Sequence, residues 1–383
     1  MKKIKSVDNA LIKIINAFIN GKELPDCGEW SQVFAFAKRH SLGNIFYLAV
    51  KDSKKVPEDV LAVAKGSFSM HTAQQISQEY YADLIFKALT EKKIKFMPLK
   101  GYYMRRIYPM PEMRTSCDVD ILYDKDKKEQ VDGILEDLGF TLDAEGKNHD
   151  HWVKDIISIE THYDLAANRE IYYDYYENIW KKLKTEDGIK FNFSDEDFYI
   201  YSIVHAAKHF SHGGFGIRTV LDIYYFRNTV KLDEIYIKEQ LDKLKLYKFS
   251  KIMESIAGGW FGDKQMDDDS ETVAKFILQS ATYGMSDDSM LMKGYAENNS
   301  AKSIKKKYIF KTLFPSFSGM KSKYKILKYL PFLLPFAWVY RWFEILFTKN
   351  KKIKEFTYKV NELNDNNYEI ISDVLKITEM PAD

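Results

Sequence analysis

Apolar residues recur at helical spacing over roughly the first quarter of the chain. Ala10, Leu11, Ile14, Ile15 and Phe18 repeat every three or four positions, and a similar repeat runs from Val33 to Ala37. The pattern further on predicts a long helix from about Ser69 to Glu91. We therefore expect residues 1–93 to form an N-terminal helical region, and they show no chemistry of their own.

The pattern changes between residues 94 and 193, where short apolar runs replace the long helical repeats. Strands are predicted at Ile94–Leu99, Asp118–Tyr123, Phe140–Leu142, His151–Val153 and Ile156–His162. Lys125–Leu138 has the spacing of an amphipathic helix, and Gly139 is a fitting stop for it. This order of elements predicts an α+β core with a small mixed sheet rather than a doubly wound parallel sheet.

Helical periodicity returns from residue 194. Ser194 followed by Asp195, Glu196 and Asp197 is typical of an N-cap and an acidic first turn. Helices are predicted near 196–211, 217–229, 232–245, 247–260 and 270–282, with exposed loops at 262–269 and 284–300. Residues 194–383 are thus expected to form a C-terminal helical domain that follows the 94–193 core.

The longest apolar stretch runs from Tyr329 to Phe347. It contains Pro331, Pro335, Arg341 and Glu344, which disfavour a membrane-spanning helix. Leu330, Leu333, Leu334, Trp338, Trp342 and Leu346 could form one apolar face, and the Lys349–Lys352 cluster follows. We expect the stretch to dock on the helical body. The alternative is peripheral contact of residues 329–352 with an anionic membrane.

Composition narrows the range of partners. The 383 residues carry a formal net charge of +2, which disfavours a long nucleic acid as partner. Cys27 and Cys117 cannot build a disulfide framework, and the N-terminus lacks the long apolar core of a signal peptide. These features predict a cytoplasmic location.

The candidate chemistry begins between Phe96 and Asp120. Asp118 and Asp120 lie two apart on a predicted strand, so their side chains point the same way, about 7 Å apart. Two like charges on an apolar strand are costly unless a cation lies between them, and such oxygen ligands suit Mg²⁺ or Mn²⁺. The Lys100-Gly101 turn ends the preceding strand, where backbone N–H groups can face a phosphate chain.

Glu160 is the candidate third carboxylate. Three carboxylates around two cations form the arrangement used for in-line phosphoryl displacement, so we expect those of Asp118, Asp120 and Glu160 to converge within roughly 5 Å. His162 shares the face of Glu160 and is either an active-site residue or a hydrogen-bonded strand histidine. A solvated aspartate pair at a strand start is the structural alternative for Asp118 and Asp120. If the pair binds metal, asparagine at either position should abolish metal-dependent nucleotide binding while holding or raising metal-free stability.

Four further residues are candidates for ligand binding. Lys100 could pair with a triphosphate or be solvated. Arg114 could clamp a phosphate or form a structural salt bridge to one of the two aspartates. His205 and His209, spaced i, i+4 on a predicted helix, could line the cleft opposite the carboxylates or pack the helix. With His212 and Asp222 nearby, they could also bind zinc.

These residues occur in an ordered set that resembles a known superfamily. The set comprises Leu99-Lys100-Gly101, Tyr108-Pro109, Arg114 and Asp118-Val119-Asp120, and it continues through Ile159–His162 and His205–His209. It resembles the DNA polymerase beta-like nucleotidyltransferases, most closely a bacterial branch of poorly characterised members. The resemblance implies a nucleotidyltransferase-type sheet flanked by the two helical regions. It also implies transfer of a nucleoside monophosphate from a nucleoside triphosphate to an acceptor hydroxyl, with release of pyrophosphate.

Residue roles follow from the resemblance. Asp118, Asp120 and Glu160 would hold Mg²⁺ or Mn²⁺ and form the catalytic set, while the Lys100-Gly101 turn would cradle the phosphates. The acceptor is an unknown small molecule or protein. The superfamily usually has Gly-Gly or Gly-Ser where this chain has Gly101-Tyr102. Two alternatives therefore stay open: a nucleotide-binding module without turnover, and a zinc-dependent hydrolase built on His205 and His209.

Overall fold

A computed structural model of the chain describes residues 4–166, 171–280, 286–348 and 350–381. The chain divides into two compact units. Unit 1 comprises Met1–Lys208, Phe215–Tyr283 and Thr378–Pro381, and unit 2 comprises His209–Gly214, Gly284–Ile377 and Ala382–Asp383. The division into 1–93, 94–193 and 194–383 stays a prediction about domains.

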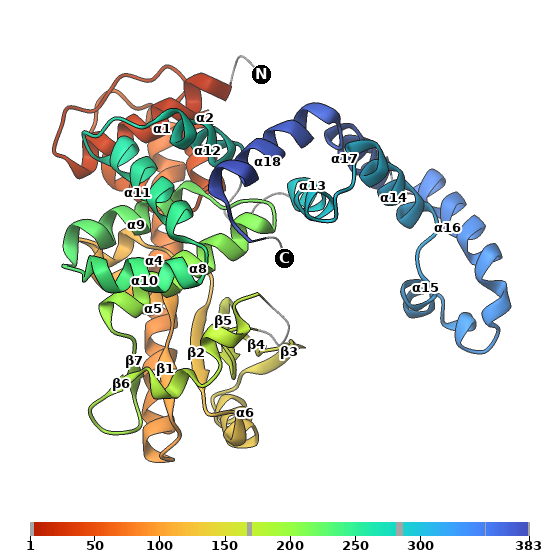
Figure 1. The fold of residues 1–383 in the computed structure, drawn as a ribbon, viewed down its shortest axis with the longest axis horizontal. Helices are drawn as coiled ribbons and strands as arrows, with labels where there is room; N and C mark the ends of the chain where they lie inside the picture. The colour runs from red at the N-terminus through yellow and green to blue at the C-terminus, as the bar shows by residue number, and fades with distance from the viewer. Residues whose placement is uncertain (1–3, 167–170, 281–285, 349, 382–383) are drawn as a thin grey trace. The chain divides into compact units, whose positions relative to one another are not determined.

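Four helices open unit 1 (Figure 1). They are α1 (Ile4–Ile19), α2 (Trp30–Arg39), α3 (Gly43–Val50) and α4 (Glu58–Glu91). Helix α4 begins well before the predicted Ser69. Pro57 precedes it in an extended conformation, and Glu58 and Asp59 in the first turn complement the helix dipole.

A five-stranded sheet lies at the centre of the α+β part. Its strands are β1 (Phe96–Pro98), β2 (Val119–Tyr123), β3 (Thr141–Glu145), β4 (His149–Lys154) and β5 (Ile157–His162), in the spatial order β1-β2-β5-β4-β3. β2 and β5 are parallel, and the other neighbouring pairs are antiparallel. The sheet is therefore mixed, as predicted, and the strand that carries Glu160 lies beside the strand that carries Asp120.

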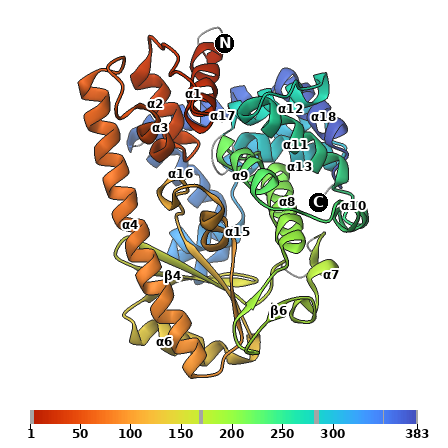
Figure 2. The same cartoon turned by 90° about the vertical axis from the view of Figure 1, so that its left-hand side faces the viewer.

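Helices α4 and α6 (Lys128–Asp137) cover one face of this sheet (Figure 2). Ile85, Phe86 and Leu89 of α4 belong to the same buried cluster as Ile121 and Ile159 of the strands. Val131, Ile134 and Leu135 of α6 complete this layer. Since strand residues alternate between faces, the positions next to these apolar residues project to the opposite side of the sheet.

The rest of unit 1 is mainly helical. Short α5 (Lys100–Met104) follows β1. Later helices are most of α8 (Asp195–Ser211), α9 (Ile217–Thr229), α10 (Glu234–Lys243), α11 (Tyr247–Phe261) and α12 (Asp268–Gln279). Between β5 and α8 lie α7 (Tyr173–Tyr176) and a small hairpin of β6 (Lys184–Thr185) and β7 (Phe191–Asn192). Ser194 caps α8 by accepting a hydrogen bond from the backbone N–H of Asp197 (3.1 Å), as the sequence predicted.

Unit 2 is helical where the structure describes it. It contains α13 (Ser286–Ala296), α14 (Ala301–Leu313), α15 (Phe317–Lys323), α16 (Leu334–Thr348), α17 (Asn350–Glu362) and most of α18 (Asp365–Thr378). The prediction of a loop at 284–300 is wrong for α13, because Leu291 and Met292 are buried and tertiary packing holds this segment as a helix. None of the described helices is long and apolar enough to cross a membrane.

Candidate active site

The polar face of the sheet brings several predicted residues together. In the parallel β2–β5 pair, Asp120 lies opposite Glu160. In the antiparallel β4–β5 pair, His149 lies opposite His162 and His151 opposite Glu160. Opposed residues share a face, and so do residues two apart on one strand. This face, turned away from α4 and α6, therefore concentrates two carboxylates and three imidazoles on three neighbouring strands.

Asp120, Glu160 and His162 form the closest cluster. His162 Nε2 lies 3.0 Å from Asp120 Oδ1 and 3.3 Å from Glu160 Oε2. One ligand atom from each of the three residues lies within 4.8 Å of the others, a group able to hold a metal ion. Asp120 is only 3% exposed and His162 only 6% exposed, while Glu160 is partly exposed. The like charges of buried Asp120 and partly exposed Glu160 are tolerable here because cationic groups lie next to them.

Lys100 supplies one of these cationic groups. Its Nζ lies 3.3 Å from Asp120 Oδ1. Burial works against the charged amine, but the negative charges, chiefly that of Asp120, outweigh it and raise the pKa of Lys100 above its ordinary value. Burial would likewise raise the pKa of Asp120, yet Lys100 and the hydrogen bond from His162 hold it well below the usual range. Asp120 is therefore ionised over the whole physiological pH range.

The pKa of His162 is raised by its place in this cluster. Burial opposes its charge, while hydrogen bonds to Asp120 and Glu160 outweigh burial and raise the pKa of the imidazole. The pKa of the neighbouring His149 shifts in the opposite direction. Burial lowers its pKa, and the neighbouring His162 charge lowers it further. The two rings are 4.8 Å apart between centroids. The pKa values of these two neighbouring imidazoles are thus shifted in opposite directions.

Asp118 occupies a different environment from Asp120. It precedes β2 and is not a member of the Asp120–Glu160–His162 group. Burial, together with the charges of Asp120 and Glu160, raises the pKa of the Asp118 carboxyl to about 6. Asp120 and Glu160 thus lie in one group with His162, and convergence of Asp118 with these two carboxylates stays a prediction.

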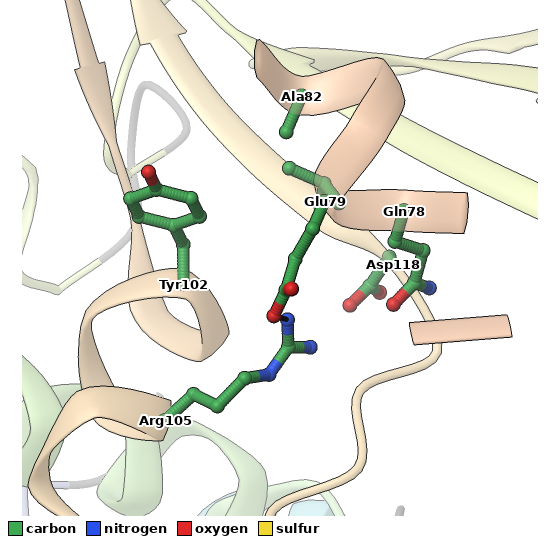
Figure 3. A pocket seen from close by; sticks show the side chains of 7 residues that line it. Gln78, Glu79, Ala82, Tyr102, Arg105 and Asp118 are labelled. Carbon is green, nitrogen blue, oxygen red and sulfur yellow. Dashed lines mark hydrogen bonds and ion pairs between the residues drawn. The ribbon is translucent and has the colours of Figure 1, made fainter. Parts of the chain in front are cut away.

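Asp118 also lines a small cavity between α4, α5 and the start of β2 (Figure 3). Gln78 and Arg105 on its wall are buried, and Arg105 Nη1 donates to Glu79 Oε1 (2.8 Å). The amide oxygen of Gln78 and Nε of Arg105 have no hydrogen-bond partner among the described residues. The cavity is thus polar on the side that reaches Asp118.

The Lys100-Gly101 turn is tied closely to β2. Leu99 N–H donates to the carbonyl of Asp120 (2.9 Å), and Lys100 has φ of +29°, a conformation that non-glycine residues rarely adopt. A Cβ on Gly101 would lie 2.7 Å from Ser116 Oγ and 3.3 Å from Ser116 Cβ. Ser116 Oγ in turn donates to the backbone oxygen of Asp118 (2.9 Å). Glycine at 101 therefore lets the turn approach the strand that carries the aspartates.

Arg114 pairs with Asp222 of α9. Its Nε and Nη2 donate to the two carboxylate oxygens at 2.8 and 3.1 Å, and Tyr108 Oη donates to the same carboxylate at 2.7 Å. Two residues of the sequence motif, Tyr108 and Arg114, thus contact Asp222, which the zinc hypothesis had counted as a nearby ligand. A phosphate-binding role for Arg114 stays a prediction.

Helix α8 brings Tyr201 and His205 close to the carboxylates. Burial, opposed by Lys100 and reinforced by Asp120 and Glu160, raises the pKa of the Tyr201 hydroxyl. The ring of His205 lies 6.3 Å from that of Tyr201, and its charge helps to lower the pKa of Asp120. His209 belongs to unit 2, so its relation to the carboxylates stays a prediction. Neither histidine is in the potential metal group found among the described residues.

A second polar chain extends the face toward β3. His151 Nδ1 lies 3.0 Å from Asp143 Oδ2, and His151 Nε2 lies 2.6 Å from Ser158 Oγ. The β3–β4 register shifts between Leu142 and Ala144, which leaves Asp143 in a bulge. Bulges re-aim side chains, and this one gives His151 a carboxylate partner.

Sequence reasoning missed His149, His151 and Ser158 as site residues. Polar residues recur at every second position in parts of His149–His162, which indicates a shared polar face. The sequence of two short strands and a hairpin turn does not show which residues pair across the strands. Tyr201 was missed because nothing in the sequence distinguishes it from other core aromatic residues of α8.

The mixed sheet with α4 and α6 on one face and clustered carboxylates on the other defines an α+β, nucleotidyltransferase-type fold. A model of the uncharacterised nucleotidyltransferase family matches residues 26–262, and the chain belongs to this family. The match spans α2 to the residue after α11, including the whole sheet. No curated protein and no solved structure matches the chain.

Proposed function

We propose that the protein is a metal-dependent nucleotidyltransferase that moves a nucleoside monophosphate from a nucleoside triphosphate to an acceptor hydroxyl. The observation that carries the proposal is the cluster of Asp120, Glu160 and His162 on neighbouring strands, beside the Lys100-Gly101 turn. In the reaction Glu160 takes the proton of the acceptor hydroxyl, and the acceptor oxygen forms a bond to the α-phosphorus. The bond from that phosphorus to the bridging oxygen of the β-phosphate breaks, and pyrophosphate leaves.

The residues present fit a divalent cation. Asp120 and Glu160 offer carboxylate oxygens, and His162 offers an imidazole nitrogen once its proton is displaced. This mixed oxygen and nitrogen set suits Mn²⁺ better than Mg²⁺, which prefers oxygen ligands alone. When bound, the cation would neutralise charge on the phosphates. Asp118, whose pKa is raised by burial and by its carboxylate neighbours, is the proposed additional ligand.

The neighbouring side chains support two further roles. Lys100 is held at the mouth of β1, where its ammonium group can turn from Asp120 to a phosphate. On the other side of Glu160, the Asp143–His151–Ser158 chain offers a hydrogen-bonding surface on which an acceptor hydroxyl can be oriented. The acceptor class we propose is a small molecule or a protein side chain.

A second candidate is nucleotide binding without turnover. Its specific support is that Gly101 is followed by Tyr102, where the superfamily has a second small residue, and that Arg114 is engaged by Asp222. Such a module would keep metal-dependent nucleotide affinity and release no pyrophosphate.

The test is to incubate the full chain with each α-labelled nucleoside triphosphate and Mn²⁺ or Mg²⁺ in a cell extract. Bound nucleotide, released pyrophosphate and labelled acceptor are measured. We expect metal-dependent binding and labelling, both lost in Asp120→Asn. Asp83→Asn, the same change at an exposed position of α4, should behave like the parent.

The outcomes separate the candidates. Binding without pyrophosphate release by the parent chain would favour the inactive module. If neither metal supports nucleotide binding, both candidates are wrong. A labelled acceptor that persists in Asp120→Asn would place the chemistry elsewhere in the chain.

A further inference from the structure

Unit 2 contains a long segment with a one-sided charge. Between Asn298 and Phe343 the sequence has nine lysines and one arginine and no aspartate or glutamate, although the whole chain has a net charge of only +2. The segment covers α14, α15, two short 3₁₀ turns (Lys325–Lys328 and Pro331–Leu333) and most of α16. The first acidic residue after it, Glu344, accepts hydrogen bonds from Lys323 and Tyr324. Its negative charge is therefore compensated within the segment.

One side of α16 is used to hold this segment together. Trp338 Nε1 donates to the carbonyl of Pro315 (3.0 Å), and Trp342 Nε1 donates to the carbonyl of Leu313 (2.7 Å). Both indole rings make edge contacts with Phe314, with centroids 5.2 and 5.3 Å away. Two members of the predicted apolar face therefore dock on the end of α14. Leu346 and the Lys349–Lys352 side chains lie outside the described residues.

Another side of the same segment projects large apolar groups into solvent. Tyr329 is 82% exposed, and Phe332 and Phe336 are each 71% exposed. Val339, one turn after Phe336, and the aliphatic Ile326 and Leu330 are exposed as well. Lys321, Lys325 and Lys328 immediately precede them in sequence and are exposed. We call Tyr329, Phe332, Phe336 and Val339, with these three lysines, the aromatic–lysine face.

A phospholipid surface accounts for both the exposed apolar side chains and the lysines of this face. Exposed apolar patches of this kind mark interaction sites, and aromatic residues flanked by lysines are typical of segments that lie in the interface of an anionic bilayer. A nucleic acid would account for the lysines and for stacking on the rings, but not for exposed Ile326, Leu330 and Val339, since bases stack on aromatic groups. The 15-residue α16, which carries Arg341 and Glu344, suits a position in the interface rather than across it.

We propose that the aromatic–lysine face of unit 2 binds the surface of an anionic phospholipid bilayer. The rings and aliphatic side chains enter the headgroup region, and the lysines pair with the negative headgroups. This inference does not depend on nucleotidyl transfer, because every residue in it belongs to unit 2, whereas the Asp120 cluster belongs to unit 1.

The experiment is co-sedimentation of the full chain with vesicles of phosphatidylcholine alone or mixed with phosphatidylglycerol. We expect binding to the mixed vesicles that weakens as salt is raised, and little binding to the neutral ones. The double variant Phe332→Ser/Phe336→Ser should bind the mixed vesicles at least tenfold more weakly. Ile76→Ser/Ile235→Ser removes equally exposed apolar groups from α4 and α10 of unit 1 and should bind like the parent.

A second variant distinguishes a loss of vesicle affinity from a folding defect. Lys321→Gln/Lys325→Gln/Lys328→Gln leaves the apolar groups in place and should lose affinity for the anionic vesicles while its circular dichroism and melting curve match the parent. Absence of binding by the parent, or parent-like binding by both sets of variants, would overturn the proposal. The proposal would also be wrong if the parent binds no vesicles and the phenylalanine variant loses RNA binding or self-association in sedimentation. The face would then bind a nucleic acid or a second copy of the chain.

Discussion

Two aspartates separated by one residue have opposite electrostatic environments. Asp120 is buried but is paired with Lys100 and His162, which hold its pKa low. Asp118 is part-buried beside two other carboxylates, and burial together with their charges raises its pKa to about 6. The sequence predicted that asparagine at either site would hold or raise metal-free stability. For Asp118 we keep that expectation, and for Asp120 its contacts with Lys100 and His162 lead us to expect a loss of stability.

For Asp118→Asn we expect the metal-free protein to gain about 1–2 kcal/mol at pH 7.5. Because the folded-state pKa is above the unfolded value of 3.8, the native state holds its proton more tightly and loses stability as pH rises from about 4 to about 6. Urea unfolding at pH 4 and pH 7.5 measures this. The gain should be present at pH 7.5 and absent at pH 4. An equal effect at both values would contradict the shift.

For Asp120→Asn we expect a loss of about 3–5 kcal/mol, because the change takes the carboxylate away from the partly buried Lys100 and the buried His162. The stabilisation by the ionised carboxylate is present above the unfolded pKa of Asp and fades as pH falls below it. Urea unfolding at pH 7.5 gives the loss directly. The double variant Asp120→Asn/Lys100→Met should recover part of it, and a full additive loss would show that the two side chains are not coupled.

Gly101 is a position where a single methyl group decides the local geometry. Gly101→Ala places a Cβ 2.7 Å from Ser116 Oγ, so we expect a loss of about 1–3 kcal/mol from forced displacement of the turn and weaker nucleotide binding. Gly133→Ala in α6 is the matched control, since no atom lies within 4 Å of its added Cβ. It should be neutral or stabilise by up to about 1 kcal/mol. Equal effects of the two changes on thermal unfolding would contradict the close approach at Gly101.

At the scale of elements, the long helix α4 is the support for the sheet. Phe86 is buried against Phe96 of β1 (ring centroids 5.2 Å apart, stacked) and makes an edge contact with Tyr102 of α5. These contacts fix the strand and the helix that flank the Lys100-Gly101 turn. Packing on the apolar face of the sheet therefore determines the position of the Lys100-Gly101 turn, which lies beside the polar face of the sheet.

Phe86→Ala should destabilise the protein by about 3–5 kcal/mol, because it removes a buried ring from this junction. Val63→Ala, on the same helix at a 60% exposed position, should change stability by less than about 0.5 kcal/mol. Chemical denaturation of both variants measures the difference. Near-equal stabilities would mean that α4 does not support the sheet through this contact.

At the scale of the whole molecule, the proposed activities belong to separate units, so their variants should be independent. We expect Phe332→Ser/Phe336→Ser to bind nucleotide with Mn²⁺ like the parent, and Asp120→Asn to bind anionic vesicles like the parent. Titration calorimetry and vesicle co-sedimentation on the same preparations provide the two measurements. A vesicle defect in Asp120→Asn, with the fold intact by circular dichroism, would show that the units are coupled.

Much of the fold could be predicted from the sequence because its signals are local. Helical periodicity located most of the helices of unit 1 to within a few residues, and alternation located the β-strands around Asp120 and Glu160. Local signals failed at α13, where burial of Leu291 and Met292 overrides a weak pattern. They also placed the start of α4 too late, at Ser69 instead of Glu58.

The sequence by itself determined the residue types available for chemistry: the carboxylates at 118, 120 and 160, the lysine-glycine turn and the histidines. Only the tertiary structure decided how they group. The parallel register sets Glu160 opposite Asp120, the β4–β5 hairpin adds His149 and His151, and Asp222 of α9 pairs with Arg114. The physical reason is the separation in sequence over which each kind of interaction acts. Periodicity and turn chemistry act over a few residues, whereas register, burial and ion pairing join residues from about 40 to over 100 positions apart, and these contacts set the pKa values of the candidate site.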